Sequence, residues 1–307
     1  MSPLQPEEQS PSDDTSADSS LVPVETGGRV DERRGDVEFR IRPRKGWRLP
    51  DFRELAAYRE LMYTLCWRDI KVRYTQTVLG IAWAVIQPLL VMVVFSIFFG
   101  NLANIPSDHI PYPLFSMTAL VPWTFFSTAL TQASTSVVNE GQLVSKVYFP
   151  RLLLPVASTL SAGVDFGIAC VVLLGMMGYY GLLPGAGVVV LPLLLLSLIA
   201  TAVGVGMWFA ALNVQFRDVR YALPFVTQVW LFVTPIAYPA SLVAQPWRTL
   251  YSINPMVGVV EGFRWALVSA PTNPAGPIAI STAVACALLV TGTLYFNRVE
   301  ARFADLI

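Results

Sequence analysis

The residues that could carry out chemistry in this sequence are few and stand far apart. The lysines are Lys45, Lys71 and Lys146, and none of them follows a glycine. A P-loop needs the pattern G-x-x-x-x-G-K-[ST], whose backbone and lysine hold the phosphates of a nucleotide. We therefore expect no ATP site of this kind, and no other cofactor bound by this chain.

Nucleophiles and metal ligands also lack the partners that catalysis requires. The single histidine, His109, lies in a short polar segment, and no serine lies in a G-x-S-x-G elbow. Cys66, Cys170 and Cys286 are too far apart to suggest metal-ligand spacing or a disulfide framework. We predict no catalytic residue and no metal site, and thus a protein that is not an enzyme.

Asp165 is the one acid within a long apolar stretch. An ionisable group inside a membrane is costly, so a functional role is the first interpretation. The alternative is an acid that holds helices together, beside the small residues Ser161, Ala162 and Gly163. Both stay open, and we favour the structural one.

The distribution of charge separates a polar N-terminal region from an apolar remainder. Residues 1–80 hold thirteen of the 21 Lys and Arg and fourteen of the 21 Asp and Glu. The mean hydropathy of +0.54 is high for a soluble protein. The net charge of zero gives no indication of nucleic acid binding. This composition is typical of a membrane domain that follows a polar head.

The polar head divides into two predicted parts. Residues 1–48 are rich in Ser, Pro, Asp, Glu and Gly, which predicts a disordered cytoplasmic tail without the apolar core of a signal peptide. Residues 49–75 predict an amphipathic helix at the membrane interface, with a packing helix as the alternative. Asp69 and Arg73 interrupt its apolar stripe near the end. The stripe consists of Phe52, Leu55, Tyr58, Met62, Leu65 and Cys66.

Residues 76–307 predict an all-α integral membrane domain with six transmembrane helices. The first segment is uncharged and long enough as a helix to cross roughly 30 Å of hydrocarbon. Pro88 would kink this helix, and a Gly- and Pro-rich turn at 181–187 separates the third and fourth spans. The predicted spans are residues 78–100, 112–138, 152–180, 188–212, 221–238 and 278–297.

The basic residues predict the orientation of these spans. Positive loops usually face the cytoplasm, and the loops with Lys146, Arg151, Arg217 and Arg220 fall on one side with the basic N-terminal region and the C-terminal tail. We therefore expect both termini in the cytoplasm. The exception is the segment between spans five and six, which carries Arg248 and Arg264.

That segment, residues 241–270, is too polar for a simple span and too apolar for a free loop. Asn254 and Pro255 form a typical helix start. We predict a re-entrant outer hairpin of two short helices, 246–251 and 255–268, which has to be buried in protein or line a cavity. Glu261 and Arg264 stand three apart and could pair on one helical face.

Aromatic residues share the second and fifth spans with hydroxyl and amide groups. Anchoring at the membrane interface is the commoner role of such rings. Rings beside amides, however, suit stacking on sugars, and Gln is unfavourable against lipid. The candidates to line a translocation path are Trp123, Phe126, Gln132, Gln228 and Tyr238.

An ordered set of short strings, from about residue 50 to the end, resembles the permeases of polysaccharide ABC exporters. This is the O-antigen and teichoic-acid type, the Wzm and TagG family of type-2 ABC exporters. The strings are Arg68-Asp-Ile-Lys-Val-Arg-Tyr74 with Leu79-Gly80, Trp83 and Gln87-Pro88; Lys146-Val-Tyr-Phe-Pro-Arg151; Arg217-Asp-Val-Arg-Tyr221; Thr234-Pro-Ile-Ala-Tyr-Pro239; Asn254-Pro-Met256; Glu261-Gly-Phe-Arg264; and Phe296 with Glu300.

The resemblance implies a half-transporter in the cytoplasmic, or inner, membrane. Two permease subunits would enclose a path for a lipid-linked glycan such as O-antigen, teichoic acid or galactan. Two separate ATPase subunits would bind ATP and Mg²⁺. The amphipathic helix and the inner loops would contact the ATPase through Arg68, Lys146, Arg151, Arg217, Asp218 and Arg220.

The outer hairpin is the predicted gate of this path. Met256 and Val260 would close the exit, while Glu261 and Arg264 fix the position of the hairpin. Two other functions stay open at this point. One is a membrane glycosyl- or acyltransferase of envelope biosynthesis, and the other is a type-2 exporter of drugs or small lipids.

Overall fold

The computed structural model describes residues 56–75, 80, 82–244, 247–270, 274–300 and 303. They belong to the second of the two units of the chain, Pro43–Ile307. Every regular element in these residues is a helix, and none is a strand. The prediction of an all-α fold is confirmed for these residues, whereas the predicted tail over residues 1–48 lies outside them.

Five helical segments in the described residues are long and apolar enough to cross a membrane. Each corresponds to one predicted span, and the chain is a multi-pass helical membrane protein. The segments are α3 (Ala82–Phe95) with the π-helix η1 (Ser96–Leu102), α4 (Tyr112–Asn139), α6 (Leu153–Ser161) with α7 (Gly163–Tyr179), α8 (Leu191–Gln215) with the 3-10 helix η2 (Ala186–Val190), and α12 (Ala275–Glu300).

The remaining predicted span, residues 221–238, corresponds to the shorter helix α9 (Val219–Val233). Its 15 residues extend about 22 Å, less than the roughly 30 Å of a hydrocarbon core. The helix ends before Thr234 and Pro235, since a proline and the residue before it disfavour helical continuation. A sixth crossing therefore stays a prediction.

The third predicted span is interrupted at Ala162, where α6 ends and α7 begins. Hydropathy does not reveal this break, because the segment is apolar on both sides of it. The break places Asp165 in the first turn of α7. The positive end of a helix dipole favours a carboxylate at that position.

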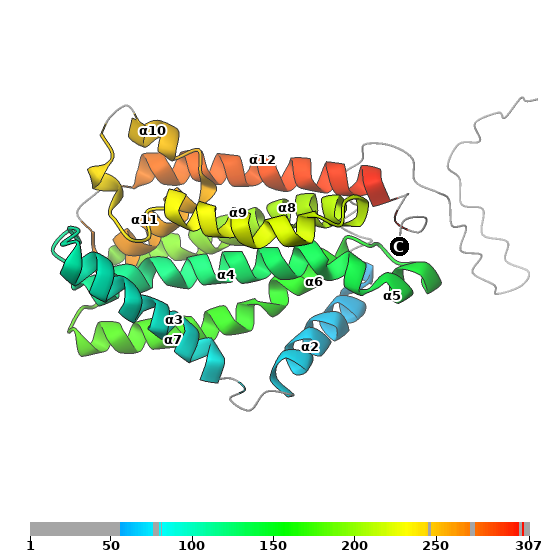
Figure 1. Ribbon diagram of the computed structural model, residues 1–307, viewed down its shortest axis with the longest axis horizontal. Helices are drawn as coiled ribbons and strands as arrows, with labels where there is room; N and C mark the ends of the chain where they lie inside the picture. Colours follow the sequence, from blue (N-terminus) through cyan, green and yellow to red (C-terminus); the bar gives the residue numbers. More distant parts are fainter. Residues whose placement is uncertain are drawn as a thin grey trace, which may run out of the picture. The chain divides into compact units, whose positions relative to one another are not determined.

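The core forms around α4, which is flanked by α8, α6 and α7. In the most apolar part of α4, 78% of the residues are buried inside the protein. The helices α8 and α12 lie side by side (Figure 1). They approach closely because Gly204 and Gly292 face each other, and a Cβ at Gly292 would collide with the Gly204 carbonyl oxygen. Such small residues allow close helix association in membranes.

Two helices occupy the segment between α9 and α12, as the sequence predicted. They are α10 (Trp247–Tyr251) and α11 (Pro255–Val268), and η3 (Ala240–Leu242) precedes them. The Asn254 side chain caps α11 by accepting a hydrogen bond from the Met256 amide at 3.1 Å. Every residue of α11 except Trp265 is buried. The depth of this pair in a membrane stays a prediction.

The two ends of the helical bundle carry different helices and loops. The short helix α5 (Gly141–Lys146), the turn between α8 and α9, and the C-terminal end of α12 lie at one end, whereas α10 lies at the other (Figure 1). Lys146, Arg151, Arg217, Arg220 and Arg298 belong to the first end. The helix α2 (Arg59–Thr75) packs against α6.

Candidate functional site

The helix α2 presents two apolar sides. Tyr58, Met62 and Leu65 of the predicted stripe pack on the cluster of buried residues that includes Leu154 and Ala157. The stripe thus contacts the rest of the protein. Tyr63 and Trp67 are exposed. Their ring types are those that favour a membrane interface, and that placement of α2 stays a prediction.

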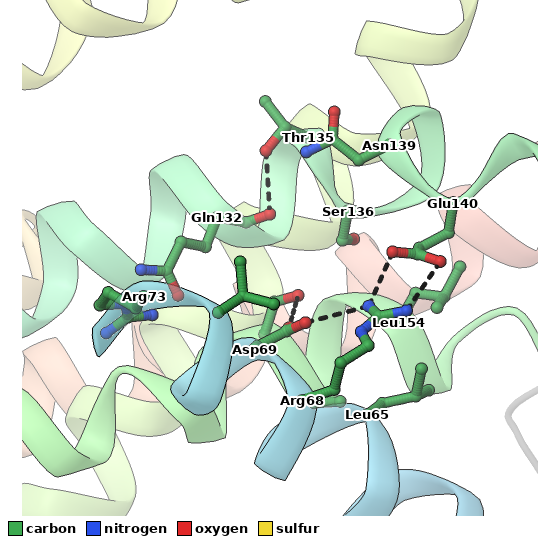
Figure 2. Close-up of a pocket in the computed structure, with 13 residues that line it drawn as sticks. Leu65, Arg68, Asp69, Arg73, Gln132, Thr135, Ser136, Asn139, Glu140 and Leu154 are labelled. Carbon is green, nitrogen blue, oxygen red and sulfur yellow. Dashed lines mark hydrogen bonds and ion pairs between the residues drawn. The ribbon is translucent and has the colours of Figure 1, made fainter. Parts of the chain in front are cut away.

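A cleft of about 330 Å³, lined by both charged and apolar side chains, lies between α2, α4 and α6, and we call it the interface cleft. Figure 2 shows Arg68 of α2 pointing toward Glu140 at the end of α4. Its lining includes Leu65, Arg68, Asp69, Gln132, Ser136 and Glu140. The cleft therefore joins α2 to the helix that forms the core of the protein.

Arg68 lines the interface cleft and lies between Asp69 and Glu140 (Figure 2). Its guanidinium donates to both oxygens of Glu140, at 3.0 and 2.7 Å, and to Asp69 at 3.0 Å. The hydrogen bond to Glu140 raises the pKa of Arg68 further above its usual value. Glu140 is the residue between α4 and α5. Arg68, predicted to contact an ATPase, thus links α2 to the junction of α4 and α5.

Asp165 has partners on α2, and the sequence did not reveal them. Arg73 forms an ion pair with its Oδ2, and the Tyr74 hydroxyl donates to its Oδ1. Desolvation, followed by the hydrogen bond to Asp165, raises the pKa of Tyr74 to about 12. Tyr74 is therefore protonated, and a donor, at neutral pH. The arrangement matches the structural interpretation of Asp165, which connects α7 to α2.

The ion pair continues into α4 through hydroxyl and amide groups. Arg73 donates to the Ser161 hydroxyl at 3.3 Å, and that hydroxyl donates to the Gln132 side-chain oxygen at 3.1 Å. Asp69 accepts from Ser158 at 3.3 Å. Asp69 and Arg73 were visible in the sequence as polar interruptions of the apolar stripe. That interruption was the signal for this network.

The other predicted coupling residues lie at the end of the bundle that carries α5. Arg151 is held by Glu300, whose side chain accepts from the Arg151 amide at 3.1 Å. Lys146, Arg217, Asp218 and Arg220 have exposed side chains. The apolar residues beside them are exposed too, namely Val147, Tyr148 and Phe216.

The predicted path residues lie in different surroundings, although the rings of Trp123 and Phe126 contact each other with centroids 5.5 Å apart. Trp123 and Phe126 are buried, and the Phe126 ring packs edge-on against Trp230 with centroids 4.9 Å apart. Gln132 lines the interface cleft. The Tyr238 hydroxyl lies 2.8 Å from that of Tyr251. In this arrangement Trp123 and Phe126 belong to the core of the protein, and their role in a path stays untested.

Gln228 belongs to a different aromatic surface, which the sequence analysis missed. Tyr221, Phe225 and Phe232 are 80%, 71% and 54% exposed, and Gln228 is exposed among them. Their spacing of four, three and four residues places all four side chains on one face of α9. We call this face the α9 stripe. The helical spacing of the rings was the signal that could have found it.

The predicted gate residues are buried in the protein. Met256 and Val260 have no exposed area, and they belong to the larger core cluster. Their gating role is therefore not visible in this arrangement and stays a prediction. The apolar residues exposed on and beside α10 are Trp247, Leu250 and Ile253.

Arg264 is a buried charged residue of α11. Glu261 pairs with it at 3.4 Å, as the sequence suggested was possible. Arg264 also donates to the Ile236 carbonyl at 2.8 Å, and its guanidinium carbon lies 3.6 Å from the centroid of the Phe115 ring. It connects α11 to α4 and to the segment after α9, so these contacts fix the position of α11.

The described residues show no group of three or more His, Cys, Asp or Glu side chains that could hold a metal ion. The long apolar helices define a helical membrane protein, and its polar residues connect helices. Residues 60–268 match the model of the ABC-2 type transporter family. The chain belongs to this family, and it is a transporter membrane subunit rather than an enzyme.

Curated relatives share most of the length of the chain. The chain is 29% identical to the O-antigen export system permease protein RfbA of Myxococcus xanthus, over 83% of this chain and 98% of that protein. It is 26% identical to a protein of the same name from Klebsiella pneumoniae, over 81% and 95%. It is 22% identical to the polysialic acid transport protein KpsM of Escherichia coli, over 66% and 78%.

Proposed function

We propose that this chain is the transmembrane subunit of an ABC exporter that moves a lipid-linked polysaccharide across the cytoplasmic membrane. The observation that carries the proposal is the alignment with an O-antigen permease over 98% of that permease. O-antigen, teichoic acid and galactan belong to the substrate class that we propose. Two copies of the chain would assemble with two copies of a separate ATPase that binds ATP and Mg²⁺.

The exposed loops at the α5 end are our proposed docking surface for the ATPase. Lys146, Arg217 and Arg220 supply positive charge there. Tyr148 and Phe216 supply exposed apolar area beside them. Aromatic and arginine side chains are common anchors at protein interfaces. We place this end, and both termini, in the cytoplasm.

The interface cleft gives the docking surface a connection to the membrane helices. Arg68 ties α2 to Glu140 at the start of α5, and Arg73 ties α2 to Asp165 in α7. A displacement of α5 by an ATPase would therefore also pull on α2 and α7. Packed helices respond to such a displacement as rigid bodies.

We propose that the α9 stripe lines the glycan path between two protomers. Its rings supply faces on which sugars slide, and Gln228 supplies hydrogen bonds. The shortness of α9 favours this placement, because a helix too short for the hydrocarbon core is better accommodated beside a polar path than in lipid. Processive movement through a continuous path suits a glycan longer than a pocket of roughly 300–1,000 Å³.

Deletion of the gene in cells that make the glycan tests this proposal. We expect loss of surface glycan, accumulation of lipid-linked glycan inside, and recovery of both with the intact gene. Loss of resistance to a drug with normal surface glycan would instead support a type-2 exporter of drugs or small lipids. Normal surface glycan would refute polysaccharide export by this chain.

A further inference from the structure

A second cavity, of about 270 Å³, lies between α3, α4 and α7, and we call it the lateral cavity. Arg73 and Gln132 line both this cavity and the interface cleft, so they form the wall between the two. The rest of its lining comes from α3 residues near Trp83, α4 residues near Thr128 and α7 residues near Asp165. None of these residues has a role in the docking surface or the α9 stripe.

Polar groups in the lateral cavity have unused hydrogen-bonding capacity. In the described part of the chain, the side chains of Gln87 and Thr128 make no hydrogen bond, and the Gln132 amide nitrogen makes none either. All three belong to helices that are long and apolar enough to span a membrane. Polar groups without partners are costly in such helices, so a polar ligand or water has to satisfy them.

Aromatic rings line the apolar part of the cavity. The rings of Phe125 and Phe166 meet edge to face with centroids 5.4 Å apart. Trp83 is half-exposed at the cavity. Flat rings beside amide and hydroxyl groups suit a ligand that has an apolar face and a polar edge. A sugar ring has both, since its C–H groups and its hydroxyls point in different directions.

The charge of the cavity decides between a sugar and an anionic headgroup. Arg73 is the basic residue of the lining, and Asp165 already pairs with it. A phosphate would have to compete with that carboxylate for the guanidinium, whereas a neutral sugar leaves the ion pair intact. The volume of about 270 Å³ is slightly below the roughly 300–1,000 Å³ of small-molecule pockets, which fits one ring rather than a chain.

We propose that the lateral cavity binds one neutral sugar ring of the exported glycan, beside the helix α2. This inference rests on the proposed function, and it assigns a sugar contact to Trp83, Gln87, Thr128 and Gln132. Arg73 and Asp165 line the same cavity, so a bound sugar would lie beside the ion pair that connects α2 to α7.

Photocrosslinking tests this site without relying on export. The photoreactive residue benzoylphenylalanine replaces Trp83 in cells whose glycan is labelled with ¹⁴C-glucose. Val171, which is exposed on α7 and outside the lining, is the matched control position. We expect ¹⁴C-labelled sugar on the protein from position 83 and only background from position 171. If the position 83 protein fails to fold, position 87 replaces it.

A pair of threonine variants adds a second measurement. Thr128→Val removes a hydroxyl from the cavity, whereas Thr131→Val removes one that bonds the Ser127 carbonyl of its own helix. Loss of a sugar hydrogen bond lowers crosslinking at position 83 roughly two- to tenfold in Thr128→Val. Thr131→Val is expected to leave it unchanged.

Two results would overturn the proposal. One is ³²P-labelled phospholipid without sugar at position 83, which would show an ordinary lipid in the cavity. The other is no ¹⁴C at positions 83 and 87 in cells that export normally. Failure of the proposed function gives a different result, because surface glycan would then be unchanged after deletion of the gene.

Discussion

Arg68 of α2 donates two hydrogen bonds to Glu140, the residue at which α4 ends and α5 begins. The two residues are 72 positions apart in the sequence. Through this pair a helix before the first span is fixed to the first loop that we expect to contact an ATPase. The contact is bidentate, a geometry in which an arginine is not replaceable by lysine.

The first prediction concerns this pair. Arg68→Glu or Glu140→Arg alone places like charges together, and we expect export to fall roughly fivefold or more when such a coupling contact is lost. The double exchange restores the attraction and should recover most of the export. Stability should change by no more than about 1 kcal/mol, because Arg68 is partly exposed.

The measurement is surface glycan per copy of permease, with the ATPase level held constant. Arg59→Glu on the same helix is the matched control, since Arg59 is exposed and outside the cleft. Equal losses in the single and double variants would contradict a role for the pair.

A second prediction concerns Arg73 and Asp165. Asp165→Leu leaves Arg73 half-buried without its carboxylate, so we expect a loss of about 1–3 kcal/mol of stability. Arg73→Leu combined with Asp165→Leu should be more stable than either single variant, because no charge then lacks a partner. Thermal unfolding in detergent gives the ranking. A double variant less stable than both single variants would rule out a structural pair.

A third prediction concerns the docking surface. Arg217→Glu and Asp218→Lys reverse exposed charges in the turn before α9, so copurification of the ATPase should fall while membrane insertion stays normal. Arg248→Glu, at the opposite end of the bundle, is the control (Figure 1). If ATPase binding is normal in both turn variants, these charges serve only to set topology.

A fourth prediction concerns the core of the hairpin. Arg264→Leu leaves Glu261 buried without its cation, and removes the hydrogen bond to Ile236 and the contact with the Phe115 ring. Breaking a buried pair in this way costs about 3–5 kcal/mol. We expect poor accumulation of the Arg264→Leu protein in the membrane. The combined Arg264→Leu and Glu261→Leu variant should accumulate better, and an Arg264→Leu protein that accumulates normally would contradict the assignment.

The gate prediction has a test of its own. Disulfide cross-linking of the hairpin between two protomers, through cysteines at Leu250, should block export while the ATPase still binds. Leu250 is chosen because it is exposed, whereas Met256 and Val260 are buried. Full export with the disulfide formed would show that the hairpin does not close the path.

The parts of this structure that sequence predicts well are those set by local chemistry. Long apolar segments with few charges mark the five long helices. Asn254 and Pro255 mark the start of α11, because capping depends on neighbouring residues. The interruption at Ala162 lies inside an apolar segment, where hydropathy is the same on both sides.

The candidate site depended on contacts between distant residues, which one sequence does not give. Asp165 and Arg73 are 92 positions apart. Ring type alone does not separate the buried Trp123 from the exposed Phe225. Helical spacing is a better signal, because it places Tyr221, Phe225 and Phe232 together on one face of α9, where all three are exposed.

Transport into inverted membrane vesicles tests whether this chain and a separate ATPase together export the glycan. Vesicles that contain this chain and its separately encoded ATPase receive lipid-linked glycan on their outer face, with ATP and Mg²⁺. We expect the glycan to become inaccessible to an added glycosidase only when ATP, the ATPase and this chain are all present. We also expect this chain alone to hydrolyse no ATP. Protection of the glycan without the ATPase, or ATP hydrolysis by the purified chain, would contradict these expectations.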